Sequence, residues 1–532
     1  MKRTWWIAII VIIAGVFIFL LSPKDSQKSK SEVVLNDILQ LQQVQISSFD
    51  PVDAYHAGHI QMVKQLYNTL VDIDISGKPV PSLAKEWESD DGITWRFYLR
   101  ENVYFIEDPC FANKSERIFT ATDVKYTFER LLNKNSKSLG ISYFTNILGA
   151  EKYRKGESNN IEGIRAIDDH TVDFVLKKED FSFPALLTLS YVSIVKEKAV
   201  EHYGEASNHH PVGTGPFILQ KYEPDKEIAL IKNRDYWEKQ AGHRLPYVDK
   251  VIVNLTTDEN LALLMFKNKK ADFLELSFPL LRQLRTMSIP FSHNIETKEN
   301  PQLNFYLYNL QKIRDEKIRK AINYAINRNE LQKILSEEGN VTRSLCPPAI
   351  FKELASSKDI LSYNPDKARA YLNKIKSLNL VCFEDILSKS IANFIAGSLK
   401  KYNIDVEIES VPFPVLVDRL TKGKYDLIQI YWGPLYTDVS HYLNPFLTSS
   451  FPPAGNNFNK YSNSEFDKLV AEAKSLPENK RKDNFLKAED VILSDMPFLL
   501  LYFKNTIRVS NEKFDMPLHP LGYRFYKYAS KR

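Results

Sequence analysis

The chain lacks the short motifs that mark several enzyme classes. Its 532 residues contain no G-x-x-x-x-G-K-[ST] phosphate loop, no G-x-S-x-G nucleophile elbow and no H-E-x-x-H zinc motif. Gly213-Thr214-Gly215 is not a dinucleotide fingerprint, because Pro216 and an apolar run follow it where a helix would have to begin. These absences exclude an ATPase. They argue against an enzyme such as a hydrolase with paired carboxylates, although motifs do not cover every enzyme.

Cysteine is scarce. Cys110, Cys346 and Cys382 show neither a C-x-x-C spacing nor a metal-site pattern. An odd, low count excludes a disulfide framework as the basis of the fold. One pair could still form in an oxidising compartment, and the spacing alone does not decide this.

Histidine pairs are the remaining candidates for a metal site. His56 and His59 lie three residues apart, and His209 and His210 are adjacent. Neither pair has a supporting cysteine or a cluster of carboxylates nearby in the sequence. We therefore expect no metal and no cofactor.

A large excess of charge of either sign is also missing. The 71 Lys and Arg against 66 Asp and Glu leave a net charge of +5, and no long basic run occurs. This balance excludes a nucleic-acid partner. The length predicts about two to four domains, and the 27 Tyr and 31 Phe can fill cores and line a ligand cleft.

The N-terminus has the form of an export signal. Lys2 and Arg3 precede an apolar run from Trp5 to Leu21, and no cysteine follows at once to accept lipid. Residues 1–22 are therefore either a cleaved signal or a retained membrane anchor, and 23–31 form a polar spacer. In both cases the body of the protein lies outside the inner membrane, in the periplasm or an equivalent extracytoplasmic space.

Residues 81–132 carry the clearest local pattern. PSLAKEWESDDGITWRFYLRENVYF is followed, after an insert, by FTATDVKYTFERLL. Asp91-Gly92 predicts a tight turn, and the alternation around Trp95 predicts a strand with one buried face. Thr120 and Asp123 form a capping box that opens a helix.

Alternating strands and helices are predicted through the rest of the chain, which is typical of an α/β protein. The predicted strands are 41–47, 171–176, 251–255, 303–310 and 425–432, with a glycine turn and strand at 212–219. The predicted helices are 57–70 and one long amphipathic helix over 317–335. Alternation in 303–310 puts Asn304, Tyr306 and Tyr308 on one face of that strand.

The order of these blocks resembles family 5 of the extracellular solute-binding proteins, the peptide and nickel receptors of ABC importers. The 81–132 block matches best. SSFDP with LYNTLVDIDISGKPVPSLA, VGTGPFIL with NRDYW, LNFYLYNL with IRKAINYAINRNEL, and YDLIQIYWGPLYTDVSHYL follow in the family's order.

The resemblance implies a two-lobed α/β periplasmic binding protein fold, class II-like and of cluster C, with an extra subdomain and an interlobe ligand cleft. Two crossover strands join the lobes. Domain I would comprise 32–53, 190–265 and 497–532, domain II 54–189, and domain III, the opposite lobe, 266–496.

The loop from Trp432 to Asp438 is the best ligand-site candidate, because α/β binding proteins hold ligands where strands end at the cleft. In peptide receptors of the family an Asp three residues after the Trp pairs with the ligand's α-amino group; here that position is Leu435. Asp438 is either structural or a substitute. We expect the ligand-binding residues to be Trp432, Gly433, Leu435, Tyr436, Asp438, Tyr67, Asn68, Tyr306 and Asn309.

The expected function is therefore capture of an oligopeptide or peptide-like ligand by hinge closure, as a monomer that delivers it to an ABC permease. Because Leu435 stands where the family's peptide receptors have an Asp, a non-peptide ligand such as a nickel chelate, haem or a cell-wall fragment remains an alternative. Retention of residues 5–21 would instead favour a membrane-tethered peptide sensor or chaperone.

Overall fold

The computed structural model describes residues 38–532 apart from 44–45, 55, 257, 349, 352–361, 434 and 453–454. The predicted signal or anchor at 1–22 and the spacer at 23–31 lie outside the described residues. Within the described part of the chain, no helix is both long and apolar enough to cross a membrane. The compact unit begins at Asp37, and everything below concerns this unit.

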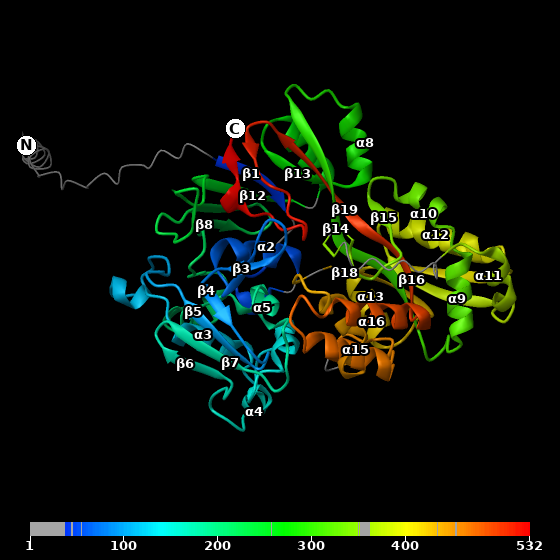
Figure 1. The fold of residues 1–532 in the computed structure, drawn as a ribbon. Helices are drawn as coiled ribbons and strands as arrows, with labels where there is room; N and C mark the ends of the chain where they lie inside the picture. The colour runs from blue at the N-terminus through cyan, green and yellow to red at the C-terminus, as the bar shows by residue number, and fades with distance from the viewer. Residues whose placement is uncertain are drawn as a thin grey trace, which may run out of the picture. The chain divides into compact units, whose positions relative to one another are not determined.

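One large sheet runs through the molecule (Figure 1). Its order is β17 (Asp405–Val411), β16 (Ser377–Phe383), β18 (Leu427–Trp432), β14 (His293–Tyr308), β19 (Phe498–Asn511), β13 (Phe273–Leu276), β1 (Ile38–Gln43), β12 (Lys250–Leu255), β9 (Glu227–Lys232) and β8 (Phe217–Glu223), with β15 (Gly339–Val341) also beside β19. β1 lies parallel to β12 and β13, and β16 lies parallel to β17 and β18. This mixture of parallel and antiparallel pairs confirms the α/β class.

The two long strands β14 and β19 pair antiparallel and connect two hydrophobic cores. Residues 303–308 and 498–503 belong to a core that is built from residues 303–503. Further along β19, Ile507 and Val509 pack instead with α7 (Glu259–Lys267) and α8 (Phe278–Thr286). The strands therefore pass from one core to the next, as crossover strands of a two-lobed protein do.

A second sheet is purely antiparallel, in the order β4 (Ala84–Glu88), β5 (Thr94–Leu99), β7 (Thr171–Val175) and β6 (Ile164–Asp168). The predicted β4–β5 hairpin is confirmed. Gly92 has φ +66°, where glycine avoids the strain of a Cβ. Asp91 Oδ1 accepts hydrogen bonds from the backbone N–H groups of Ile93 and Thr94, both at 2.8 Å.

The predicted capping box is also confirmed. The Thr120 N–H donates to Asp123 Oδ2 at 2.9 Å, at the start of α3 (Ala121–Leu131). Val124, Phe128 and Leu131 of this helix are buried with the second sheet in a core that spans residues 70–212. A further core combines residues 46–67, 195–273 and 514–529, which are far apart in the sequence.

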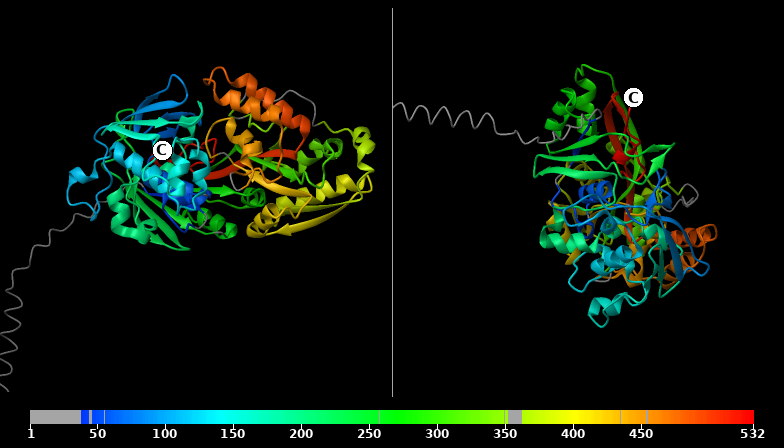
Figure 2. Two further views of the ribbon diagram at one scale, coloured as in Figure 1. Left: turned by 90° about the horizontal axis from the view of Figure 1, so that it is seen from below. Right: turned by 90° about the vertical axis from the view of Figure 1, so that its left-hand side faces the viewer.

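The other helices are α2 (Ala57–Leu66), α4 (Ala150–Lys155), α5 (Phe183–Leu186), α6 (Glu197–Tyr203), α9 (Glu316–Ala325), α10 (Arg328–Leu335), α11 (Pro365–Leu372), α12 (Ile386–Lys400), α13 (Phe413–Thr421), α14 (Ser440–Leu443), α15 (Ser464–Lys474) and α16 (Lys482–Asp495). Short strand pairs are β2 (Val71–Ile73) with β3 (Pro79–Pro81), β10 (Lys239–Gln240) with β11 (His243–Arg244), and β20 (Phe514–Asp515) with β21 (Ser530–Lys531). In Figure 2 (left) the yellow and orange helices gather around the β14–β18 end of the large sheet, and the blue and cyan segments gather at the other end.

The single long helix predicted over 317–335 is wrong, because the structure has two helices there. α9 ends at Ala325, and Asn327 opens α10 by accepting hydrogen bonds from the N–H groups of Asn329 and Glu330. An asparagine at this position satisfies donors that a new helix would otherwise leave unpaired. The apolar periodicity continues across the break, so periodicity alone does not reveal it.

The helix predicted over 57–70 is four residues too long. α2 ends at Leu66, and Tyr67 has an extended backbone. The Leu66 carbonyl accepts a hydrogen bond from the N–H of Gly215 at 3.0 Å, in the glycine turn before β8. A contact with a distant segment therefore ends this helix.

Candidate functional site

A cavity of about 700 Å³ lies between the core of residues 70–212 and the core of residues 303–503. Residues 142–186 line one side, and residues 432–474 line the other. A second pocket of about 680 Å³ shares Asn146, Lys177, Asp180, Leu447, Ser449 and Lys474 with it, so the two form one groove. This volume suits a ligand of a few residues.

Three contacts hold the two sides of the groove together. The N–H of Phe181 donates to the Lys474 carbonyl at 2.8 Å, and Lys474 Nζ lies 2.7 Å from Asp180 Oδ2. The ring of Tyr143 meets the ring of Tyr436 edge to face, with centroids 6.0 Å apart. The two sides are therefore in direct contact around the cavity.

Trp432 and Tyr436 line this cavity. β18 ends at Trp432, whose Nε1–H donates to the carbonyl of His441 at 3.2 Å and whose ring stacks on His441. The Tyr436 hydroxyl lies 3.3 Å from Asn444 Nδ2, and burial raises the pKa of Tyr436 well above its usual value. Both side chains present aromatic surface that is fixed by neighbouring groups.

His441 holds the loop after β18 in place through contacts with Trp432 and Gly433. Burial lowers the pKa of His441 to about 4, so the ring is neutral at pH 7. Nε2 lies 3.0 Å from the Gly433 carbonyl, which only accepts, so Nε2 carries the proton. Gly433 thus contributes its backbone to the loop and is not among the residues that line the cavity.

Asp438 is buried beside a cation. Its carboxylate lies 2.5 Å from Arg481 Nη2, and Oδ1 accepts from the N–H of Ser440 at 2.8 Å. Only 1% of its side chain is exposed, and it is not among the cavity-lining residues. This is the arrangement of a carboxylate that holds a loop in place.

Leu435 is half-buried and packs against the cores on the first side of the groove. Its carbonyl accepts a hydrogen bond from the Tyr523 hydroxyl at 3.3 Å. The position where the resemblance calls for a carboxylate is therefore an apolar contact outside the cavity lining.

Tyr67 and Asn68 lie in a buried network instead. Asn68 Oδ1 accepts from Thr214 Oγ1 at 3.1 Å and from Trp237 Nε1 at 3.2 Å. Tyr67 is 5% exposed and packs in the core of residues 46–67. The structure does not bring either residue to the cavity.

Tyr306 and Asn309 are also buried away from the cavity. Asn309 Nδ2 donates to the carbonyls of Gly423 and Tyr425, which ties the end of β14 to the segment before β18. Tyr306 is fully buried, because residues on both faces of 303–308 are covered. Alternation alone could not distinguish this strand from one with an open face.

The sequence analysis did not identify the polar and charged residues that line the cavity. Arg154 of α4, Lys177 and Asp180 line it from one side, and Asn444 and Lys474 line it from the other. In the sequence these residues look like ordinary surface charge, and no spacing links them. The three cysteines form no disulfide with one another, since all three are buried free thiols.

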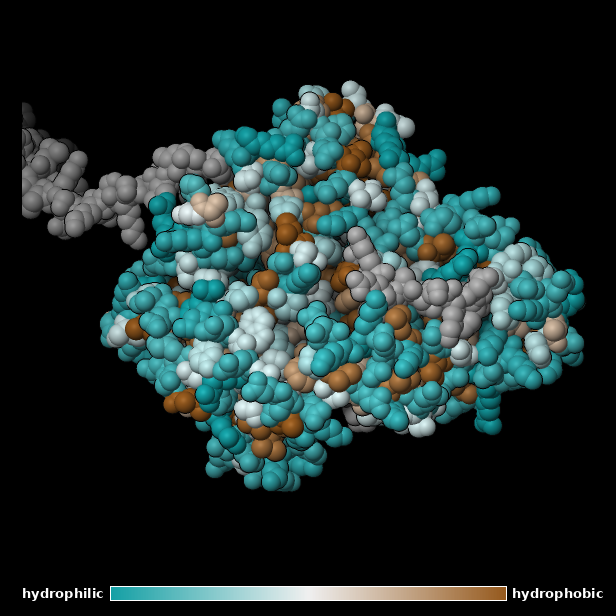
Figure 3. Space-filling view, in the orientation of Figure 1, coloured by the Kyte–Doolittle hydropathy of each residue, from teal (hydrophilic) through white to brown (hydrophobic). Residues whose placement is uncertain are grey.

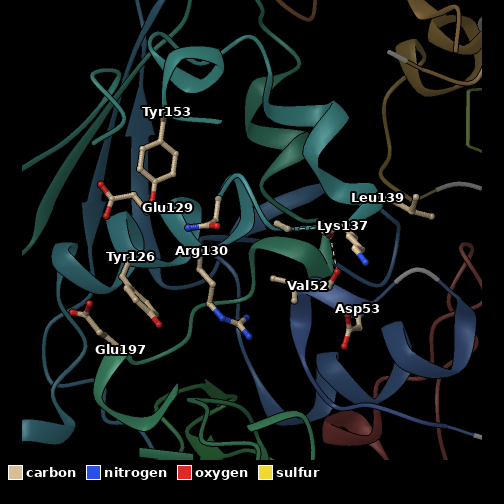
Figure 4. A pocket seen from close by; sticks show the side chains of 12 residues that line it. Val52, Asp53, Tyr126, Glu129, Arg130, Lys137, Leu139, Tyr153 and Glu197 are labelled. Atoms are coloured by element: carbon tan, nitrogen blue, oxygen red, sulfur yellow. Dashed lines mark hydrogen bonds between the residues drawn. The ribbon is translucent and has the colours of Figure 1, made fainter. Parts of the chain in front are cut away.

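Another pocket, of about 730 Å³, lies on the first side alone (Figure 4). Tyr126, Glu129 and Arg130 of α3 line it with Tyr153 and Asp53. Burial raises the pKa of Glu129, and Arg130 is held by Asp50 at 2.8 Å. Since this pocket does not join the two sides of the groove, it is a weaker candidate for a site that responds to closure.

The fold and the cavity define a class, a two-lobed α/β binding protein with a candidate site between parts that two long strands join. Residues 78–452 match the middle region of the bacterial extracellular solute-binding proteins, family 5, and the chain belongs to this family.

Characterised relatives cover nearly the whole chain. The dipeptide-binding protein DppE of Bacillus subtilis is 26% identical over 515 residues, 91% of this chain and 90% of the relative. Heme-binding protein A of Haemophilus influenzae is 25% identical, over 81% of this chain and 80% of the relative. DppA from Helicobacter pylori in complex with the peptide STSA has a similar fold, with a TM-score of 0.77 at 23% identity, covering 93% of this chain and 98% of that one.

Proposed function

We propose that this protein binds an oligopeptide or peptide-like ligand in the groove between its two lobes and delivers it, as a monomer, to an ABC permease. One observation carries the proposal: a cavity of about 700 Å³ is lined from both sides and bordered by direct contacts between them. The relatives named for dipeptides support the class of ligand.

Closure would couple ligand capture to a change of shape. A ligand in this cavity touches residues from both sides at once, and those contacts exist together only when the sides are close. Ligand therefore shifts the equilibrium toward the closed form. We take β14 and β19 as the hinge, because both strands pass from the core of residues 303–503 to the core that contains Ile507 and Val509.

We propose the division into three domains that the family resemblance implies. Domain I would be 32–53, 190–265 and 497–532, domain II 54–189, and domain III 266–496. The separate cores of residues 70–212 and 303–503 support this division. Residues 5–21 would hold the protein at the outer face of the inner membrane or be removed after export.

Native mass spectrometry of the purified full chain tests the ligand class. A heterogeneous set of short peptides bound at one per chain is expected. A single haem or metal mass, in a sample that ignores a pool of synthetic di- to pentapeptides, would overturn the proposal.

A further inference from the structure

We infer that the ligand is selected through an anionic group, a carboxylate held by Arg154 in the groove, and that a free α-amine is not required. This inference rests on the proposed function and names the substrate class of the same site.

The carboxylates that line the main cavity are already engaged. Glu151 Oε1 lies 2.8 Å from Lys155 Nζ, and Asp180 Oδ2 lies 2.7 Å from Lys474 Nζ. Asp180 also accepts from the N–H of Ser182 at 3.0 Å. An incoming ammonium group would compete with a lysine at each carboxylate, most strongly at Asp180, where 4% of the side chain is exposed, and only weakly at Glu151, which is 65% exposed.

The cations of the same wall are not all engaged. Arg154 and Lys177 line the cavity, and neither has an ion pair within the described residues. Arg154 is half-buried, and its Nη1 is a buried donor without a hydrogen-bond partner in that part of the chain. An unsatisfied guanidinium donor is costly, and a carboxylate is its best geometric match.

Asn444, which lines the cavity from the other side, carries a complementary acceptor. Asn444 Nδ2 donates to the Tyr436 hydroxyl at 3.3 Å, while its Oδ1 is buried without a partner among the described residues. Oδ1 can accept the N–H of an amide. Arg154 and Asn444 together therefore suit a ligand with a carboxylate and an amide N–H, which describes a short peptide whose N-terminus is blocked or free.

The adjoining pocket adds no carboxylate to the lining of the main cavity. Its further charges are Lys178, Glu179 and Asp467. Asp467 Oδ1 accepts from the N–H of Thr448 at 3.1 Å, and Glu179 is exposed next to Lys178. Neither carboxylate lines the cavity that contains Arg154.

The experiment compares capture from three pools of the same short peptides: unmodified, N-acetylated and C-terminally amidated, each without acidic side chains. Bound peptides are released from the full chain and quantified by mass spectrometry. Acetylation should change capture by less than about threefold, and amidation should lower it by about tenfold or more, since it removes the charge-assisted partner of Arg154.

Two variants localise the effect. Arg154→Gln should lower capture of the acetylated pool by about tenfold and leave capture of the amidated pool nearly unchanged. Arg154→Lys should restore part of the loss, and Lys152→Gln, on the same helix but outside the cavity lining, should behave as the unmodified protein. Equal melting temperatures exclude misfolding as the cause.

The outcomes separate the inference from the proposed function. Loss of capture on acetylation but not on amidation would overturn the inference and leave peptide binding intact. Arg154→Gln without effect on any pool would also overturn it. Failure of the unmodified protein to capture peptides from all three pools would overturn the proposed function itself.

Discussion

Asp438 and Arg481 form a buried ion pair, with Oδ2 and Nη2 2.5 Å apart and with 1% and 12% of their side chains exposed. Asp438 lies in the loop after β18, and Arg481 immediately precedes α16. The pair joins the loop that contributes Tyr436 to the cavity with α16, a helix of the core of residues 303–503. The carboxylate that appears in the sequence as a ligand candidate thus supports the shape of the site.

Replacement of Asp438 by Asn should destabilise the fold by about 3 kcal/mol, because it leaves the Arg481 guanidinium buried without a counter-charge. Urea denaturation measures the loss. Asp405→Asn is the control: Asp405 pairs with Lys400 in solvent, with side chains 74% and 70% exposed, and should change stability by about 0.5 kcal/mol or less. Equal losses for the two variants would contradict this account.

Glu489 should make stability depend on pH. Burial raises its pKa to about 7 from 4.5, although the N–H groups of Leu345 and Cys346 and the Ser344 hydroxyl donate to it. Between pH 4.5 and 7 the folded state therefore binds more protons at this site than the unfolded state, and stability falls as pH rises through this range.

The Glu489→Gln variant removes this titration. In the unmodified protein, the titration of Glu489 should lower the free energy of unfolding by on the order of 3 kcal/mol between about pH 4.5 and 7. The variant should not show this decrease. Guanidinium unfolding at a series of pH values measures both profiles. Parallel profiles for the two proteins would rule out Glu489 as the source.

Lys474→Gln should weaken the closed arrangement. The variant keeps the backbone carbonyl that accepts from Phe181 and removes only the charge beside Asp180. Asp180 then stays buried and unpaired when the sides meet, whereas water solvates it when they part. We expect a larger radius of gyration by small-angle X-ray scattering and ligand affinity lower by about tenfold.

Lys468→Gln on the same helix is the control for that experiment, since Lys468 is 73% exposed and pairs with Glu472 of its own helix. It should leave both the scattering curve and the affinity unchanged. A Lys474 variant that behaves like the Lys468 variant would show that the Asp180 pair does not contribute to closure.

Two glycines should respond in opposite directions to alanine. A Cβ at Gly213 would lie 2.1 Å from the Leu66 carbonyl oxygen, a backbone atom that cannot move aside. A Cβ at Gly397, at an exposed position three residues before the end of α12, meets nothing within 4 Å. Gly213→Ala should destabilise the fold by about 3 kcal/mol or more, and Gly397→Ala should stabilise it by about 0.5–1 kcal/mol. Thermal unfolding of both variants measures the contrast, and two changes of the same sign would contradict it.

The sequence by itself determined the features that depend on neighbours along the chain. The Asp91-Gly92 turn and the Thr120–Asp123 capping box both form as predicted, because each is a hydrogen-bond arrangement within a few residues. Periodicity also located several strands, such as β7, β12 and β18, to within about two residues. It failed at Asn327, where a cap interrupts an unbroken apolar pattern.

Only the tertiary structure decided which residues meet in the groove. The end of β18 places Trp432 and Tyr436 at the cavity, a location that a strand pattern can indicate. Three features depend on segments that are distant in the sequence: the partner of Asp438, the covering of Tyr306 on both faces, and the presence of Arg154 and Asn444 in the lining of one cavity. Burial and pairing between such segments set the charge of the cavity, and no local pattern encodes them.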